Sequence, residues 1–354
     1  MTANSMDKPL YSLVATLGLI TLTGYLLVIG EQILLPLVLA ILVSYLITAL
    51  GHRIERLHIG KWRPPAWMGL SGAVLAVVLI VGLIVQLVAS NISEVIDGAP
   101  RYQVQFQNLL TKITDLAAKY LNRDRPITVT AVLEEINIRD VLERFALAFQ
   151  SIAGNTFQVL AYVTFLLLER RMFDRKLSLL FPDPSREQTI RATFKYIGNK
   201  IEAYMLIKTG ISLLNGVLSY IVLTLFNVDF AGFWALLVFV LNFIPYIGSP
   251  IAMLFPTLLA LLQFGSIVMA AFVLGSLWAI QAFVENFIEP RITGRTLNLS
   301  PLVMIVALSV WGAIWGITGM ILSVPLMVMI MIILSQFPKT RPIAIVMSER
   351  GEIV

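Results

Sequence analysis

The polar residues between 281 and 298 are the part of this sequence best suited to chemistry. Glu285 and Glu289 stand four residues apart, which places both carboxylates on one face of a helix. Two carboxylates with the amide of Asn286 beside them can bind a cation, exchange a proton or accept hydrogen bonds from a polyol. The candidate binding set, which includes one amide from an earlier segment, is Asn242, Gln281, Glu285, Asn286, Glu289, Arg291 and Arg295. The two arginines in this set are placed to neutralise the carboxylates.

These residues also have structural explanations. A long charged side chain near a membrane interface can keep its apolar stem in the hydrocarbon and place its charged head at the membrane surface. This would account for the 281–298 cluster and for Lys208. Charges at membrane depth cost roughly 2.5–3.5 kcal/mol each by insertion scales, however, so they tend to be functional. Asn242 lies alone in apolar sequence just before Pro245. Its amide either caps backbone groups freed by a helix break or contacts a solute.

The composition places much of the chain in lipid. Of its 354 residues, 58% are hydrophobic and 13% are charged, whereas an average soluble domain carries about 25% charged residues. A membrane-spanning helix needs roughly 20 mainly apolar residues. The uninterrupted runs that we predict to be spans are 10–29, 33–50, 66–89, 152–168, 204–226 and 266–283.

Several kinds of site are missing from the sequence. There is no cysteine, which excludes disulfides, thiol catalysis and cysteine metal sites. The histidines His52 and His58 are six residues apart, whereas a helical metal pair needs a spacing of three or four, so we expect no metal site. The zinc-protease, nucleophile-elbow and phosphate-loop motifs are also missing. We therefore expect a protein that is not an enzyme, with no cofactor, no direct use of ATP and no nucleic-acid partner.

Two further apolar runs, 230–262 and 301–334, contain helix-breaking residues. Broken helices persist in a membrane only where they are buried in protein or line a wet cavity, and paired broken segments indicate a transport site. Residues 246–256 also align with 315–325, each with an aromatic residue ten positions before a proline; the alternative is coincidence in apolar sequence. The expected helix-breaking or gating residues are Pro245, Gly248, Pro250, Pro256, Pro290, Gly294, Gly312, Gly316, Gly319 and Pro325.

These segments predict an all-α, polytopic helical membrane protein of about eight spans, with re-entrant segments and a small extracytoplasmic helical insert. In the insert, apolar residues fall at helical spacing over 102–120 and again over 132–149. The expected divisions are 1–90 (a three-span region), 91–150 (the amphipathic insert), 151–226 (spans four and five with a cytoplasmic amphipathic linker), 227–336 (the broken-helix transport region) and 337–354 (a cytoplasmic tail).

The distribution of charge predicts the orientation, because basic loops stay in the cytoplasm. Loop 51–65 has four basic residues against one acidic residue, and 169–208 has nine against five. The insert 91–150 has seven basic residues against eight acidic ones. This pattern places the amino terminus and both basic segments inside, and the insert outside. The basic residues of the tail place the carboxyl terminus inside as well.

Three blocks in the last third of the chain carry a family pattern. The first is an Ile-Pro-Tyr-x-Gly block, the second is Glu-Asn with a later proline and glycine, and the third is three spaced glycines with a closing proline. The matching positions are 242–248, Pro250, Pro256, Glu285, Asn286, Pro290, Gly294, Pro301, Gly312, Gly316, Gly319 and Pro325. This part, 230–335, resembles the autoinducer-2 exporter family of bacterial membrane proteins, and the rest matches in layout. Ser249 stands where many relatives place a proline, which shifts the break by one residue.

The resemblance implies a bacterial inner-membrane location and export of a small polar signal or metabolite without ATP hydrolysis. It also implies homo-oligomers, pentamers included. Some relatives are described as sodium/proton antiporters.

Three functions follow as hypotheses. The first is a secondary transporter that exports a small polar solute or signalling molecule. The second is a cation/proton antiporter in which the same carboxylates bind Na+ or H+. The third is a membrane scaffold that binds a partner through 91–150 and transports nothing.

Overall fold

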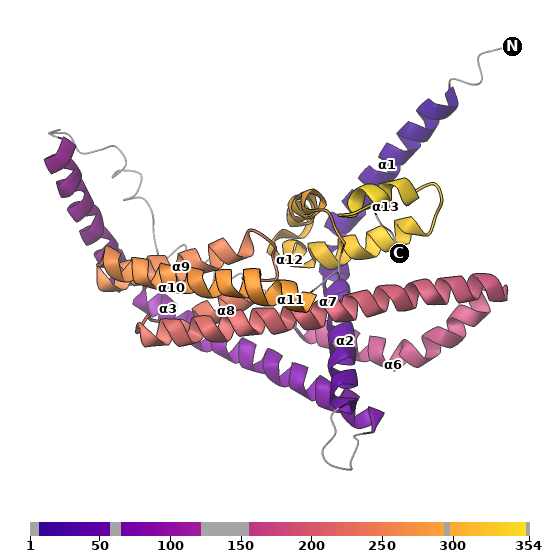
Figure 1. The fold of residues 1–354 in the computed structure, drawn as a ribbon, viewed down its shortest axis with the longest axis horizontal. Helices are drawn as coiled ribbons and strands as arrows, with labels where there is room; N and C mark the ends of the chain where they lie inside the picture. The colour runs from indigo at the N-terminus through magenta and orange to yellow at the C-terminus, as the bar shows by residue number, and fades with distance from the viewer. Residues whose placement is uncertain (1–6, 57–64, 122–155, 294–297, 352–354) are drawn as a thin grey trace. The chain divides into compact units, whose positions relative to one another are not determined.

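The computed structural model describes residues 7–56, 65–121, 156–293 and 298–351, and this part of the chain is helical (Figure 1). Within it the one β-type pairing is an isolated bridge between Leu299 and Ser348. The protein is therefore an all-α polytopic membrane protein, as its sequence predicts.

The chain divides into two compact units. Unit 1 comprises residues 1–46, 157–202 and 297–354, and unit 2 comprises 47–156 and 203–296. The boundaries cut through two long helices, α2 (Glu31–Glu55) and α7 (Pro184–Leu225). Each unit is described by itself.

Unit 1 contains the first and last helices of the chain. These are α1 (Asp7–Ile29), the first part of α2, α6 (Thr156–Leu180), the first part of α7, α12 (Pro301–Ser335) and α13 (Arg341–Met347). The indole Nε1 of Trp315 donates to the backbone carbonyl of Leu27 at 3.0 Å, which joins α12 to α1. A Cβ on Gly198 would lie 3.1 Å from the Tyr45 ring, so α2 and α7 pack closely here.

Unit 2 contains the helices that hold the candidate site. They are the end of α2, α3 (Ala66–Leu121), the rest of α7, α8 (Ala231–Leu241), α9 (Gly248–Phe264), α10 (Ile267–Phe283), the π-helix η1 (Val284–Ile288) and α11 (Glu289–Thr293). α8, α9 and α10 lie side by side (Figure 1). A Cβ on Gly216 would lie 3.2 Å from the Ala235 carbonyl oxygen, so this glycine lets α7 approach α8.

Polar contacts fix α3 to the loop between α7 and α8. The phenol of Tyr102 donates to Asp229 Oδ2 at 2.7 Å. Gln263 then holds the loop from α9, because its Nε2 donates to the Asn227 carbonyl at 2.7 Å and its Oε1 accepts from the Asp229 N–H at 2.9 Å.

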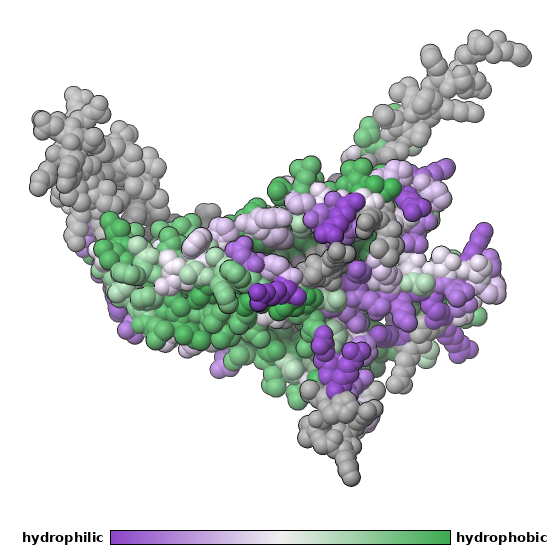
Figure 2. Space-filling view, in the orientation of Figure 1, coloured by the Kyte–Doolittle hydropathy of each residue, from purple (hydrophilic) through white to green (hydrophobic). Residues whose placement is uncertain are grey.

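Five helices of the described residues are long and apolar enough to cross a membrane. They are Glu31–Glu55, Trp67–Gln86, Pro184–Leu225, Ile267–Ile292 and Pro301–Ser335. Shorter apolar helices cover Leu17–Ile29, α8 and α9. Figure 2 shows a hydrophobic surface over α9 and α10, where large side chains such as Phe272 and Trp278 are exposed, as lipid contact requires. The total of about eight spans stays a prediction.

Two helices continue where the sequence predicted separate elements. α3 runs for 56 residues from the third span into the expected insert. α7 runs for 42 residues and joins the expected linker to span five. The change from an all-round apolar to an amphipathic pattern alters which face is buried, but it does not break the backbone. The second expected insert helix, 132–149, lies outside the described residues.

The apolar runs 230–262 and 301–334 each contain a helix break, but fewer residues than expected cause these breaks. α8 and α9 are ~16 Å and ~26 Å long, each short of a ~30 Å hydrocarbon core, and residues 242–247 separate them. α12 leaves helical dihedral angles at Trp315 and Gly316. The expectation that Pro256 and Pro325 break helices is wrong: both lie buried inside continuous helix. Gly312 and Gly319 also have helical backbone.

Candidate functional site

Polar side chains from three neighbouring elements form a hydrogen-bonded cluster inside unit 2. Two come from α7, two flank the break between α8 and α9, and two come from α10 and η1. We call this set the polar cluster; its members are Ser212, Asn215, Asn242, Ser249, Gln281 and Glu285.

Gln281 is the centre of the polar cluster. Its Nε2 lies 2.6 Å from Ser249 Oγ, 2.5 Å from Glu285 Oε1 and 3.2 Å from Asn242 Oδ1. The Ser249 hydroxyl also donates to Glu285 Oε1 at 2.9 Å. A primary amide has two hydrogens to donate, so three acceptors compete for them.

Asn242 connects this centre to α7. Its Oδ1 accepts from Asn215 Nδ2 at 3.3 Å, and its Nδ2 donates to Ser212 Oγ at 2.9 Å. The end of α8 is closed by the backbone N–H of Asn242, which bonds to the carbonyls of Val238 and Val240. The side chain of Asn242 therefore joins the polar cluster and does not cap its own helix.

Most of the polar cluster is buried. Ser212 and Asn215 are 0% exposed, Asn242 is 3% exposed and Gln281 is 6% exposed. Glu285 is exposed, so the cluster extends from a buried amide network to an accessible carboxylate. The Oδ1 of Asn215 has no hydrogen-bond partner among the described residues. A buried acceptor without a partner is costly, so a donor or cation that reached this oxygen would be stabilised there.

A tight turn brings Asn242 and Ser249 together. Tyr246 has a φ of 61°, and the Ile247 N–H donates to the Pro245 carbonyl at 2.7 Å. This is a γ-turn with positive φ, a rare and strained conformation. Such strain persists only where the surrounding structure enforces it, and it is concentrated at functional sites.

Gly248 completes the turn because no side chain fits there. A Cβ on Gly248 would overlap the Leu241 carbonyl oxygen and lie 2.7 Å from the carbonyl carbon. The break therefore needs glycine at this position, as its place in the Ile-Pro-Tyr-x-Gly block suggested.

The break in α12 has a similar, though not identical, local construction. Gly316 has a φ of 59°, and a Cβ on Gly319 would overlap the Trp311 carbonyl oxygen and lie 2.7 Å from its carbon. In both breaks a residue with positive φ precedes a glycine that fits against a carbonyl of the preceding helix. The geometry supports an internal repeat, but it pairs Gly248 with Gly319, two residues later than the sequence alignment does.

Glu285 and Glu289 have separate partners. Glu285 belongs to the polar cluster, whereas Glu289 Oε1 accepts from Lys208 Nζ at 3.1 Å. The helix that carries them is not regular, because η1 bonds residue i to i+5 and so holds one extra residue. Pro290 favours this, since it cannot donate an N–H and its ring crowds the carbonyl four residues earlier.

The other predicted site residues lie outside the polar cluster. Asn286 Nδ2 donates to the Ala282 carbonyl of its own helix at 2.7 Å. Arg291 is exposed and forms no ion pair with either carboxylate in the part of the chain that the structure describes. Arg295 and Gly294 lie outside the described residues. The described residues also contain no group of three or more metal-binding side chains.

Comparison with known proteins agrees with this architecture, in which broken and complete spans surround a buried polar site. A profile of AI-2E family transporters matches residues 11–339. The chain belongs to the AI-2E transporter family. It is thus a multi-pass membrane transporter, and the resemblance seen in its last third extends over nearly the whole chain.

Curated relatives of this AI-2E family member carry different functional names. The AI-2 transport protein TqsA of Escherichia coli is 28% identical over 97% of this chain and 99% of its own length. A Haemophilus influenzae protein named only for transport is 30% identical over 89% of both chains. A sodium-lithium/proton antiporter of Halobacillus andaensis is 22% identical over 88% of this chain and 92% of its own length.

Sequence reasoning missed several partners in this AI-2E family site. Ser212, Asn215 and Ser249 were not among the candidates, and Lys208 was expected to extend to the membrane surface. A signal was present on α7, where Lys208, Ser212, Asn215 and Ser219 recur at helical spacing in apolar sequence.

Proposed function

We propose that this AI-2E family transporter exports a small polar solute by secondary transport and binds it at the polar cluster. The observation that carries the proposal is the buried amide and hydroxyl network at a helix break, in which one acceptor has no partner among the residues that the structure describes. Buried polar groups in a transporter's spans are expensive and mark substrate or ion pathways. Hydroxyls and amides both donate and accept, which suits an uncharged solute rich in hydroxyl groups.

The name of one relative supports the proposal that a small signalling solute is carried. This relative, named for AI-2 transport, covers nearly the full length, and four of the six members of the polar cluster lie within 230–335, where the family pattern is strongest. The proposed setting is a bacterial inner membrane with both termini in the cytoplasm, and a homo-oligomer, a pentamer among the possible forms.

The test is counterflow of a radiolabelled small polyol in proteoliposomes. Gln281→Leu should abolish counterflow, because it removes the donor shared by Ser249, Asn242 and Glu285. Gln86→Leu removes the same group from an exposed position on α3 and should leave flux unchanged. Equal flux in wild type and Gln281→Leu would refute the assignment of the site.

Cation/proton antiport is the second candidate, and Glu285 favours it. Its Oε1, Ser249 Oγ and Asn242 Oδ1 all surround one amide group, so oxygen ligands converge at this point. A cation that displaced the Gln281 amide would meet these oxygens. Sodium-dependent proton movement in proteoliposomes that disappears in Glu285→Gln, without any organic solute, would favour this candidate over the first.

A further inference from the structure

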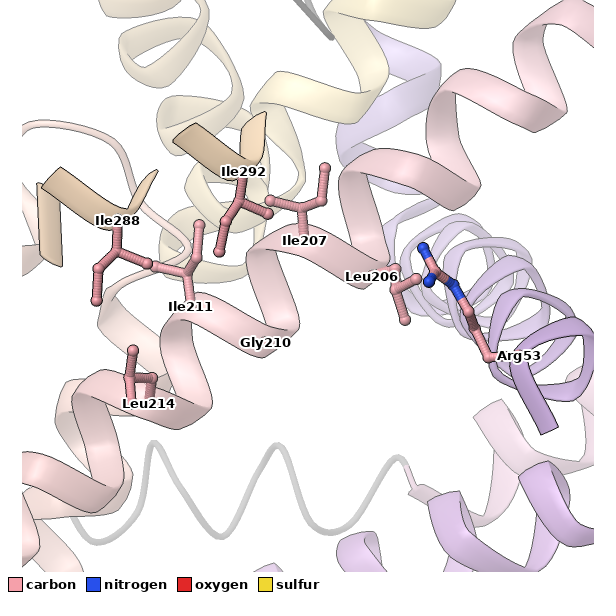
Figure 3. A pocket seen from close by; sticks show the side chains of 8 residues that line it. All are labelled: Arg53, Leu206, Ile207, Gly210, Ile211, Leu214, Ile288 and Ile292. Carbon is pink, nitrogen blue, oxygen red and sulfur yellow. The ribbon is translucent and has the colours of Figure 1, made fainter. Parts of the chain in front are cut away.

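A groove in unit 2 lies on a different face of α7 from the polar cluster. Its volume is 370 Å³, within the roughly 300–1,000 Å³ range of ligand pockets. One wall is the α7 stripe that includes Leu206, Gly210 and Leu214, and the opposite wall is formed by Ile288 and Ile292 (Figure 3). Every lining residue except Arg53 is apolar or glycine.

The groove has a charged end and an apolar end. Arg53 lies beside Leu206, whereas Leu214 and Ile288 lie at the far end (Figure 3). The distance from residue 206 to residue 214 along α7 is ~12 Å. The lining thus matches a molecule with an anionic head and a hydrocarbon tail.

The position of Arg53 identifies where such a molecule would come from. Arg53 is in the last turn of α2, a candidate spanning helix, and it is exposed. The ends of spanning helices lie at the level of lipid headgroups, where basic residues attract anionic lipids. In the part of the chain that the structure describes, no carboxylate forms an ion pair with Arg53.

Gly210 keeps the groove open. A Cβ on Gly210 would meet nothing within 4 Å, so this glycine is not required for close packing of helices. A larger side chain here would project into open space in the groove without displacing backbone.

We infer that this groove is a binding site for one anionic phospholipid, with its phosphate at Arg53 and an acyl chain along α7. The site is separate from the polar cluster. It places a lipid against both α7 and the η1–α11 segment, the two elements joined by the Lys208–Glu289 ion pair.

The test measures lipid binding to the full-length protein in detergent by native mass spectrometry. Phosphatidylglycerol and phosphatidylcholine with identical acyl chains are the two probes. Wild type should bind phosphatidylglycerol about fivefold more tightly, the contribution of one basic residue near an anionic headgroup. Arg53→Gln should remove this preference, whereas Arg56→Gln, which removes the same charge one turn away, should retain it.

Variants that fill the groove test the acyl-chain part of the site. Gly210→Leu should weaken binding of both lipids, and Gly210→Ala should do so to a smaller extent. The control is Gly275→Leu, because Gly275 is exposed on α10 and a Cβ there also meets nothing within 4 Å. Melting temperatures of all variants confirm that they are folded.

Three results would overturn the inference. One is equal affinity of wild type for the two lipids, and another is an equal loss of preference in Arg53→Gln and Arg56→Gln. The third is that Gly210→Leu changes the number of chains in the assembly while the amount of bound lipid stays the same. This result would show that a second copy of the chain covers the groove.

Discussion

Single hydrogen bonds decide what the polar cluster can accept. Gln281 offers two hydrogens to three acceptors, and Asn215 Oδ1 lacks a donor within the described part of the chain. A solute hydroxyl can correct both mismatches, since it donates and accepts at once. Binding would then replace an imperfect network by a satisfied one, which favours polar solutes over apolar ones of equal size.

Ser249→Ala should weaken solute binding by about 10- to 150-fold, because it removes a hydroxyl that a bound solute would contact and its hydrogen bond to the Glu285 carboxylate, a bond of a type worth ~1.5–3 kcal/mol. Ser249 Oγ is the one atom that contacts both Gln281 and Glu285 within the polar cluster. Ser309→Ala is the control, since that exposed hydroxyl bonds only to its own helix at the Ile305 carbonyl. The measurement is the substrate concentration for half-maximal counterflow, and an unchanged value in Ser249→Ala would contradict the prediction.

The Lys208–Glu289 pair should behave as one energetic unit. Its side chains are 12% and 28% exposed, so neither charge is fully hydrated. Lys208→Met should lower the melting temperature, because it leaves Glu289 without its cation, and Glu289→Gln in the same chain should recover part of the loss. A double-mutant cycle on thermal stability in detergent should give a coupling of ~0.5–3 kcal/mol. Additive effects would show that the pair is merely a surface contact.

Among the elements, the two helix breaks depend on glycine more than on proline. Gly248→Ala and Gly319→Ala should each sharply reduce the yield of folded protein, because the new methyl group overlaps a backbone carbonyl. Gly275→Ala should be neutral or stabilising by up to ~1 kcal/mol, since that helical glycine has open space around it. Size-exclusion profiles and melting temperatures distinguish these outcomes. Normal folding of Gly248→Ala would mean that the break can relax.

The contact of α3 with the α7–α8 loop should depend on alkaline pH. Burial raises the pKa of the Tyr102 phenol, and the adjacent Asp229 carboxylate raises it further. The folded pKa lies above the unfolded value of about 10, so the stabilisation is complete below pH 10 and is lost as pH rises above it.

Tyr102→Phe should therefore melt below wild type at neutral pH, by the equivalent of ~1.5–3 kcal/mol for a bond to a charged group. The difference should shrink as the pH rises above about 10. Thermal melts of both proteins at pH 7, 9 and 11 provide the measurement. A constant difference across this range would show that folding does not raise the pKa of the phenol.

The sequence predicted spans and breaks because both depend on neighbouring residues. The lengths of the apolar runs located α2, α10 and α12. Gly248 correctly indicated the turn between α8 and α9. Pro256 was wrongly predicted to break the helix because proline disfavours helix in general. In α9 the proline is buried, and packing around it holds the helix together. The π-helix could not be predicted, since Glu285 and Glu289 show a normal spacing and only Pro290 indicates a disturbance.

Partners across elements were harder to predict than the elements. Gln281 and Glu285 were selected as members of one polar stretch and Asn242 as a lone amide in apolar sequence, and the structure shows that Gln281 bonds to both of the others. Ser212 and Asn215 join them only because Gly216 lets α7 approach α8, a packing detail that one sequence does not specify.

For the whole molecule, residues 122–148 of the insert should be dispensable for transport. The polar cluster and both breaks lie outside these residues, and Tyr102, which bonds α3 to Asp229, would remain in the shortened chain. Replacing 122–148 by a glycine-serine linker should therefore preserve counterflow. Complete loss of flux in a folded variant would contradict this prediction, whereas a lack of flux in the wild type itself would favour the scaffold hypothesis.

The π-helix at Val284–Ile288 has a consequence for how this chain could be altered. Because η1 holds one residue more than an α-helical turn, deleting one residue inside it would let the backbone return to ordinary winding with little rotation of the residues that follow. Glu289 and Ile292 would then stay close to Lys208 and to the groove wall. The same deletion inside α10 would instead rotate everything after it by ~100°, so this chain should tolerate the loss of one codon at Val284–Ile288 far better than in the regular helix before it.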